Sequence, residues 1–152
     1  MSAGNSFKIP VSALVVIHTP SLEVLLIERS SHPGYWQSVT GSQEPGETLL
    51  QTAARETAEE TGIQMTLDRF VDWQRENVFE IFPIWRHRYA PGVTQNTEHV
   101  FSLEVQSRMP VRLRDGEHTQ SVWLPHEKAA SLCFSWSNRD AILDLPGRLG
   151  RA

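Results

Sequence analysis

Residues 41–63 read GSQEPGETLLQTAARETAEETGI, and this stretch decides the fold and the chemistry of the chain. It opens as a loop, because its first glycine and the Pro-Gly pair that follows favour turns. Thr48 stands three residues before Gln51, which is the spacing of a capping box. Gly62 stands where helices commonly end in a left-handed residue. The spacing predicts a helix from about Thr48 to about Thr61.

This helix carries an acidic edge. At about 100° per residue, one arc of small and apolar residues should face the core: Leu50, Ala53, Ala54, Thr57, Ala58 and Thr61. Glu56 and Glu60 lie beside that arc, one turn apart, and Glu59 lies further toward solvent. Such like charges destabilise a helix by a few tenths of a kcal/mol per pair. On its own, the cluster is equally typical of a solvated surface or of a divalent metal site, since Mg²⁺ and Mn²⁺ prefer carboxylate oxygens.

The wider spacing favours the metal site. It matches the Nudix box throughout its fixed positions: Gly41, Glu47, Arg55-Glu56, Glu59-Glu60 and Gly62-Ile63. The chain therefore resembles the Nudix hydrolase family. Thr57 departs from the pattern, which has a bulky aliphatic residue there, so we expect looser packing with the acidic side chains unaffected. In the family the box glutamate, here Glu47, commonly holds the box arginine, here Arg55.

The resemblance implies an α/β (α+β) fold, an α/β/α sandwich with a mixed β-sheet. It implies hydrolysis of diphosphate linkages in nucleoside-type substrates with Mg²⁺, or with Mn²⁺. By similarity Glu56 and Glu60 would be metal ligands, and Glu59 a further ligand or the base that activates water, so that Glu59 and Glu60 are the candidate catalytic residues. A metal ion would bridge the anionic triphosphate and the carboxylates and lower the pKa of water.

Further segments resemble the bacterial Nudix enzymes that act on 7,8-dihydroneopterin triphosphate: WQSVTGS (36–42), FEIF (79–82), RHRYAPGVTQNTE (86–98) and SWSNR (135–139). This resemblance implies release of pyrophosphate and the monophosphate, in folate biosynthesis. It implies Glu117 as a third metal ligand, although by itself Glu117 reads as an ordinary loop acid. The substrate contacts that it implies are Lys8, Arg29, Thr40, Phe79, Glu80, Ile81, Phe82 and Ser135. Of these, Lys8 and Arg29 would bind the triphosphate, and Phe79 and Phe82 would pack on the pterin.

Two alternatives remain beside this reading. One is a Nudix enzyme for another substrate, such as an oxidised purine nucleotide or a dinucleoside polyphosphate. The other is a binding module that has lost catalysis, which the intact set of box carboxylates argues against. No phosphate-binding Gly-Lys-Ser/Thr loop, Gly-x-Ser-x-Gly turn or metal-spaced histidine pair is present.

Composition narrows the class of protein. A length of 152 residues predicts one domain, 1–152, with loose ends at 1–6 and 146–152. A net charge of −4 gives no reason to expect a nucleic-acid or membrane-surface partner. The family resemblance implies a small triphosphate as the partner. The longest early apolar stretch, 13–17, is too short to cross a bilayer. A single cysteine, Cys133, is compatible with a cytoplasmic location.

The remaining pattern is mostly β. Runs rich in β-branched and aromatic residues predict strands at 11–17, 24–27, 35–40, 66–74, 77–89, 100–105 and 121–124, the first two joined as a hairpin. Short helices are predicted at 127–132 and at 137–143, the latter with Ser137 as its N-cap. We expect the large aromatics Trp36, Trp85 and Trp136 to be core residues.

Overall fold

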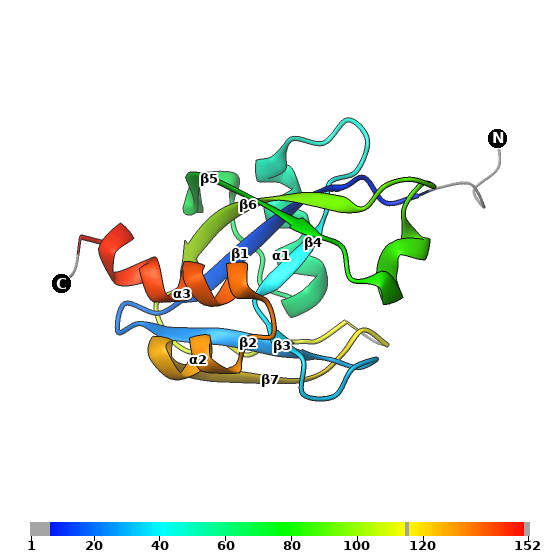
Figure 1. Ribbon diagram of the computed structural model, residues 1–152. Coiled ribbons are helices and arrows are strands. Elements are labelled where there is room, and N and C mark those ends of the chain that lie inside the picture. Colours follow the sequence, from blue (N-terminus) through cyan, green and yellow to red (C-terminus); the bar gives the residue numbers. More distant parts are fainter. Residues whose placement is uncertain (1–6, 115, 151–152) are drawn as a thin grey trace.

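The computed structural model describes residues 7–114 and 116–150, and Figure 1 shows a mixed sheet with helices around it. The strands are β1 Val11–His18, β2 Glu23–Arg29, β3 Trp36–Gln37, β4 Val39–Ser42, β5 Phe70–Glu80, β6 Gln95–Glu104 and β7 His118–Pro125. The helices are α1 Leu49–Thr61, α2 His126–Leu132 and α3 Trp136–Arg148, with short 3-10 turns η2 Leu67–Arg69 and η3 Pro83–Arg88. The mixed α/β architecture is as predicted.

The sheet is centred on β1. Its order is β3-β2-β1-β6-β5, with β4 also paired to β1 and β7 paired to β2. The pairing of β1 with β6 is parallel and the other pairings are antiparallel. The predicted hairpin of β1 and β2 is present, with His18 opposite Val24. None of the described helices is long and apolar enough to cross a membrane.

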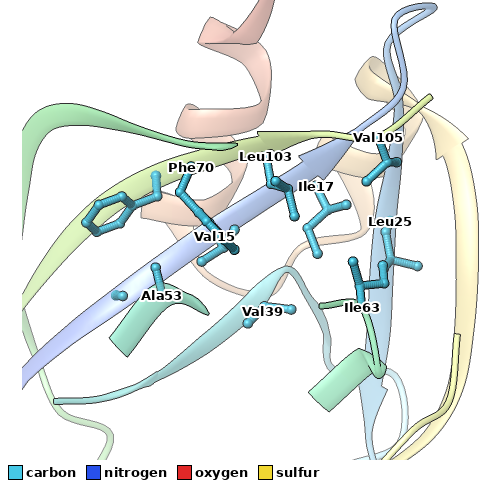
Figure 2. Packing of buried hydrophobic residues seen from close by; sticks show 11 residues of the cluster. Val15, Ile17, Leu25, Val39, Ala53, Ile63, Phe70, Leu103 and Val105 are labelled. Carbon is cyan, nitrogen blue, oxygen red and sulfur yellow. The ribbon is translucent and has the colours of Figure 1, made fainter. Parts of the chain in front are cut away.

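Two apolar clusters cover the two faces of β1. Val15 and Ile17 pack into one cluster together with Ala53 of α1, as Figure 2 shows. Leu14 and Val16 pack into the other cluster, which α2 and α3 complete. Because successive side chains of a strand point to opposite faces, a strand buried on both sides reads as a continuous apolar run. This explains the uninterrupted apolar sequence 13–17.

Helix α1 forms as the sequence predicts. The Thr48 hydroxyl accepts from the backbone N–H of Gln51, whose side chain accepts from the backbone N–H of Thr48. Gly62 ends the helix with φ 76°, a left-handed conformation. The buried side is wider than the wheel suggests, since Glu56 and Glu60 are buried beside the small residues. Glu56 and Glu60 therefore point into the molecule, whereas Glu59 is exposed.

The segment after Glu80 differs from the prediction. We expected an extended strand through 89, but β5 ends at Glu80 and η3 begins at Pro83. Proline lacks a backbone N–H and cannot continue a strand ladder. In a 3-10 turn, residues three apart lie above one another, and the rings of Phe82 and Trp85 stack with centroids 5.2 Å apart. The predicted strand 35–40 is likewise divided into β3 and β4.

The last helix also differs from the prediction. It runs over Trp136–Arg148 instead of 137–143, and Ser135, not Ser137, is the N-cap, accepting from the backbone N–H of Asn138. The predicted loose end at 146–152 is wrong for residues 146–148, which are helical. Arg148 holds this end in place, with its guanidinium over the ring of Trp73 at 4.9 Å from the ring centroid. Residues 1–6 and 151–152, also expected to be loose, lie outside the described residues.

Candidate functional site

One cavity of about 1150 Å³ gathers the candidate residues. Every residue that the sequence proposed for catalysis, metal binding or substrate binding lines it: Lys8, Arg29, Thr40, Glu56, Glu59, Glu60, Phe79, Glu80, Ile81, Phe82, Glu117 and Ser135. These residues come from segments spread over most of the chain. The fold therefore brings all of them to one place.

Glu56 and Glu60 are the buried acids of this cavity. Their exposed fractions are 8% and 3%. Burial raises the pKa of Glu56 to about 7, with the nearby charge of Glu59 acting in the same direction. Burial, followed by the charge of Glu56, raises the pKa of Glu60 well above its usual value. The pair is therefore a costly arrangement unless a cation compensates it.

The donor set fits a divalent metal ion. Oε1 of Glu60 is buried and has no hydrogen-bond partner among the described residues. Two carboxylates with an unsatisfied oxygen are the hard ligands that small divalent cations prefer. Among the described residues, no group of three or more His, Cys, Asp or Glu side chains stands ready to hold an ion. The structure thus offers the Glu56–Glu60 pair without a preformed third ligand.

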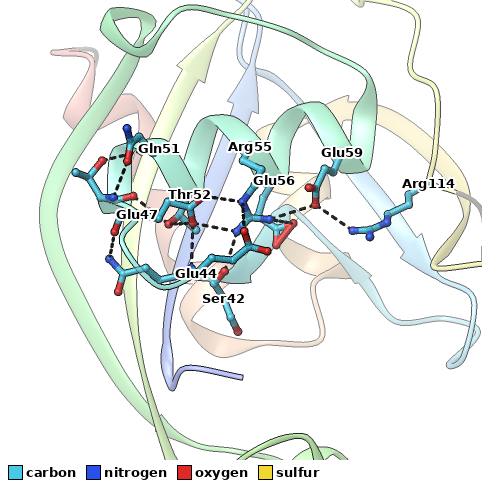
Figure 3. Close-up of polar contacts among 11 residues, drawn as sticks. Ser42, Glu44, Glu47, Gln51, Thr52, Arg55, Glu56, Glu59 and Arg114 are labelled. Carbon is cyan, nitrogen blue, oxygen red and sulfur yellow. Dashed lines mark hydrogen bonds and ion pairs between the residues drawn. The ribbon is translucent and has the colours of Figure 1, made fainter. Parts of the chain in front are cut away.

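Glu117 and Glu59 are joined by an arginine that sequence reasoning missed. Nη1 of Arg114 lies 3.0 Å from Oε1 of Glu59, a contact visible in Figure 3, and its Nε lies 3.2 Å from Oε2 of Glu117. All three side chains are more than a third exposed. The only sequence signal was the position of Arg114 three residues before Glu117. The positively charged guanidinium of Arg114 therefore lies between two carboxylates of the site.

The expected pair of Glu47 and Arg55 is confirmed (Figure 3). Nε of Arg55 donates to Oε2 of Glu47 at 2.7 Å, and Nη2 donates to Oε1 at 3.1 Å and to the Ser42 carbonyl at 3.0 Å. The hydrogen bond from Arg55 holds the pKa of Glu47 down at about 2. Arg55 also donates to Glu59 at 3.2 Å. This bidentate pair ties the loop before α1 to the helix and orients Glu59.

Two basic residues, Lys8 and Arg29, lie near the acidic residues of the cavity. Burial, with the charge of Arg88 next, lowers the pKa of both Lys8 and Arg29. Arg29 donates through Nη1 to Oε1 of Gln37 at 3.2 Å, and its guanidinium lies over the ring of Trp85 at 4.5 Å from the centroid. Its buried Nε has no partner among the described residues. Arg29 is thus held in place with a free donor, as a phosphate ligand requires.

The aromatic lining corrects one expectation. Trp85 and Trp136 were expected in the core, but both line the cavity, and Trp136 is 46% exposed. Trp36 does pack, partly buried, against the second apolar cluster. Phe82 stacks on Trp85, and Phe134 lies edge-on to both rings. Trp85 lies in η3 and not in the strand that we expected at 77–89, and this places it at the cavity.

A polar wall on β6 was not singled out from the sequence. Asn96 and Glu98 line the cavity and are buried. Asn138 of α3 lines it as well, and its Oδ1 accepts from the backbone N–H of Ser38 at 2.8 Å. These residues were missed because the predicted strand begins at residue 100, whereas β6 begins at Gln95 and so includes Asn96 and Glu98. Arg86 pairs with Glu80 and not with Glu98.

Comparisons with known proteins find relatives that match most of the chain. The family model described as NUDIX domain matches residues 8–145. The dihydroneopterin triphosphate diphosphatase of Escherichia coli strain K12 is 47% identical over 139 residues, which are 90% of this chain and 91% of that protein. The enzyme of the same name from Haemophilus influenzae is 38% identical over 135 residues, 86% of this chain and 84% of that one.

Solved structures extend the likeness. The dihydroneopterin triphosphate pyrophosphohydrolase of E. coli superposes with a TM-score of 0.84 at 46% identity, covering 91% of this chain and 95% of that one. An Ap4A hydrolase from Caenorhabditis elegans gives a TM-score of 0.72 at 21% identity, over 93% of this chain and 98% of that one. The second likeness is one of fold alone.

Proposed function

Because the chain belongs to the Nudix family, we propose that it hydrolyses 7,8-dihydroneopterin triphosphate to the monophosphate and pyrophosphate. The curated relatives named for this activity are 47% and 38% identical to the chain over most of its length. The observation that carries the proposal is the single cavity that joins buried carboxylates, held cations and exposed aromatic rings. These are the groups that a metal ion, a triphosphate and a flat heterocycle need.

Nudix hydrolases use divalent metal ions, and Mg²⁺ is the ion that we propose here, with Mn²⁺ as a substitute. Glu56 and Glu60 would hold it, since their buried carboxylates lack a compensating cation. Glu117 would join them once its side chain leaves Arg114. A bound divalent ion neutralises the polyphosphate and makes water a better nucleophile.

The residues of the chain supply the remaining chemistry. Lys8 and Arg29 would bind the phosphates and keep them in line with the attacking water. The water oxygen would form a bond to the α or the β phosphorus, the bond from that phosphorus to the oxygen that bridges the two would break, and Glu59 would take the proton from water; either route gives the monophosphate and pyrophosphate. Arg55 donates to Glu59 at 3.2 Å and would hold its carboxylate in that position. Phe79 and Phe82 would pack on the heterocycle.

Four further residues that line the cavity supply the remaining contacts of the proposal. Thr40 and Ser135 carry hydroxyl groups at the wall and would hydrogen-bond to the substrate. Glu80, at the end of β5, and Ile81, which follows it, line the cavity and would also contact the substrate. The side chain of Glu80 already pairs with Arg86, with Nη2 and Oε1 3.2 Å apart, so we propose a contact at the cavity wall and no role in the reaction itself.

Replacement of Glu60 by glutamine tests the metal-dependent activity. We expect Glu60→Gln to lose most of the turnover on 7,8-dihydroneopterin triphosphate, with an unchanged circular dichroism spectrum. Calorimetry should show Mg²⁺ or Mn²⁺ uptake by the unaltered protein that is weakened in the variant. Glu104→Gln, a change on β6 outside the cavity, is the matched control and should keep the normal rate. A near-normal rate of Glu60→Gln at saturating Mg²⁺ would refute the assignment.

A substrate panel tests the identity of the heterocycle. Pyrophosphate release is measured with 7,8-dihydroneopterin triphosphate, an oxidised purine triphosphate, ordinary nucleoside triphosphates and a dinucleoside polyphosphate. We expect the highest kcat/KM with the pterin compound and weaker action on the ordinary nucleotides. A preference for a purine compound by about an order of magnitude, about 1.4 kcal/mol in transition-state binding, would replace the pterin in the proposal.

We also propose that residues 1–152 form one domain around this cavity. The NUDIX match spans 8–145, and the described sheet runs from Val11 to Pro125, with α3 packed on it. Limited proteolysis of the whole chain should leave one resistant core. Two separable stable fragments would contradict this.

A further inference from the structure

Two side chains of β6 form a polar patch inside the cavity. Asn96 and Glu98 are two residues apart on the strand and therefore point to the same face. Both are 4% exposed, and both line the cavity. Across the ladder Asn96 lies opposite Phe79, and Glu98 lies opposite Asn77. The patch is therefore beside Phe79, one of the rings proposed to pack on the heterocycle.

Each member of the patch has an acceptor without a partner. Oδ1 of Asn96 and Oε1 of Glu98 are buried and have no hydrogen bond to any described residue. The amide nitrogen of Asn96 is engaged, since it donates to Oγ of Ser12 at 2.8 Å, so the oxygen is its free atom. Buried acceptors without donors are unusual in folded proteins, and each calls for an explanation. The partners that these two oxygens lack are hydrogen-bond donors.

The carboxylate of Glu98 has no cationic partner among the described residues, so it is not part of a structural ion pair. Burial raises its pKa to about 7, and only hydrogen bonds from Ser137 and Asn77 oppose this effect. A ligand that donates two hydrogen bonds to this carboxylate would stabilise its charged form. A metal ion would do the same, but it would need further ligands beside the carboxylate.

We propose that Glu98, assisted by Asn96, recognises the hydrogen-bond-donor edge of a 2-amino-4-oxo-pyrimidine ring. That edge carries a ring N–H and an exocyclic NH₂ side by side, which match the two oxygens of a carboxylate. The pterin ring of the proposed substrate has this edge, and guanine has the same one. The inference rests on the proposed function for its substrate and adds which residues select the ring.

The surrounding rings fit a flat ligand whose edge meets Glu98. Phe79 stands beside the patch, and Trp136 at the start of α3 lines the same cavity with nearly half of its surface exposed. A heterocycle between such rings would expose its faces to aromatic side chains and its donor edge to the carboxylate. Specificity then comes from a polar contact that rejects rings lacking the amine, because the buried acceptors would remain unpaired.

The test uses neopterin, a fluorescent pterin without phosphates, and protein without added metal. Binding is followed by fluorescence for the unaltered chain, for Glu98→Gln and for the control Glu104→Gln. We expect Glu98→Gln to weaken neopterin binding by at least about tenfold, because glutamine offers one acceptor and one donor to an edge with two donors. The control should bind as the unaltered chain does. Thermal unfolding of each variant verifies that it is folded.

Competition identifies the edge that is recognised. Guanosine has the exocyclic amine and inosine lacks it, and the two are otherwise the same. Guanosine should displace neopterin at a concentration at least about tenfold below that of inosine, and Glu98→Gln should abolish this difference. Asn96→Ala is a second variant and should reduce neopterin affinity less than Glu98→Gln does.

Three results would overturn the inference: no neopterin binding by the unaltered chain, equal binding by Glu98→Gln, or equal displacement by guanosine and inosine. The assay needs neither metal nor hydrolysis, so it fails separately from the proposed function. Pyrophosphate release with unselective ring binding would leave the activity and remove this role of Glu98. Selective ring binding without any pyrophosphate release would do the reverse.

Discussion

A Cβ atom on residue 41 would lie 1.5 Å from Oε2 of Glu56 and 2.0 Å from its carboxyl carbon. The carboxylate of Glu56 therefore lies directly against the backbone of β4, where Gly41 pairs with Ala13 of β1. The glycine is required for close approach, since its backbone does not adopt a positive φ. This contact fixes where the first proposed metal ligand can lie.

Gly41→Ala should displace the Glu56 carboxylate and weaken metal binding. The overlap involves the end of a side chain, so we expect the fold to persist while Glu56 rotates away. We predict a loss of at least about tenfold in kcat/KM and a higher Mn²⁺ concentration for half-maximal rate. Both are measured by pyrophosphate release over a metal titration. An unchanged metal requirement would show that the position of Glu56 does not matter.

Gly147→Ala provides the control for that change. Gly147 lies in α3, and a Cβ there would meet no other atom within 4 Å. Its backbone is not left-handed. Alanine in a helix is favoured over glycine by roughly 0.5–1 kcal/mol. The control should keep its activity and melt at the same or a slightly higher temperature.

Glu47→Gln should lower the stability of the protein near neutral pH. Glu47 accepts two hydrogen bonds from Arg55, one from Thr52 and one from the backbone of Glu44. Loss of the charge at this pair should cost about 2 kcal/mol. Urea denaturation at pH 7 measures the change. Glu127→Gln, in the first turn of α2, is a surface control with an expected change within about 0.5 kcal/mol.

The same pair predicts a pH dependence. The folded pKa of Glu47, at about 2, is below the unfolded value of 4.5, so its contribution is present above pH 4.5 and is lost as the pH falls toward 2. The difference in stability between the unaltered chain and Glu47→Gln should therefore shrink between pH 4.5 and pH 2. A difference that stays constant over this range would contradict the charge-based explanation.

The sequence predicts the acidic helix well because its signals are local. The capping box of Thr48 and the left-handed Gly62 define the ends of α1, and the wheel places Glu56 beside Glu60. Local spacing sufficed because caps and helix faces depend on residues only a few positions apart. The predicted pairing of Glu47 with Arg55 came from the family resemblance and is present in the structure.

The other wall of the cavity was harder to predict, since it depends on pairing between distant segments. Glu98 becomes part of the site only because β6 pairs with β1 and β5, and Trp85 only because Pro83 ends the strand and starts a turn. Arg114 meets Glu59 across 55 positions of sequence. No local pattern encodes such contacts, and Glu98 lay outside the strand predicted at 100–105, since β6 begins earlier, at Gln95.

Arg114→Ala should strengthen metal binding in the absence of substrate. Its guanidinium contacts both Glu59 and Glu117, and a metal ion that uses Glu117 must replace it. The pairs are largely exposed, so the expected gain in Mn²⁺ affinity is modest, roughly two- to fivefold, measured by calorimetry. Arg108→Ala removes an exposed arginine that pairs with Glu23 and should leave the affinity unchanged. Weaker Mn²⁺ binding by Arg114→Ala would show that the arginine supports the metal site.

Glu98→Gln should gain stability relative to the unaltered chain as the solution becomes mildly alkaline. The folded pKa of Glu98, about 7, is above the unfolded value of 4.5, so its favourable contribution is present below pH 4.5 and is lost as the pH rises through 7. Glutamine cannot ionise, so the variant avoids this loss, which amounts to at most about 3 kcal/mol.

Urea denaturation at pH 5 and pH 8 measures this effect. Glu56 and Glu60 also have raised pKa values, but they are present in both proteins, so their effect cancels in the difference. Relative to the unaltered chain, Glu98→Gln should gain stability between the two pH values, whereas Glu104→Gln should not. An equal difference at pH 5 and pH 8 would mean that Glu98 ionises freely in the folded protein, because a carboxyl group with an ordinary pKa cannot make folding depend on pH in this range.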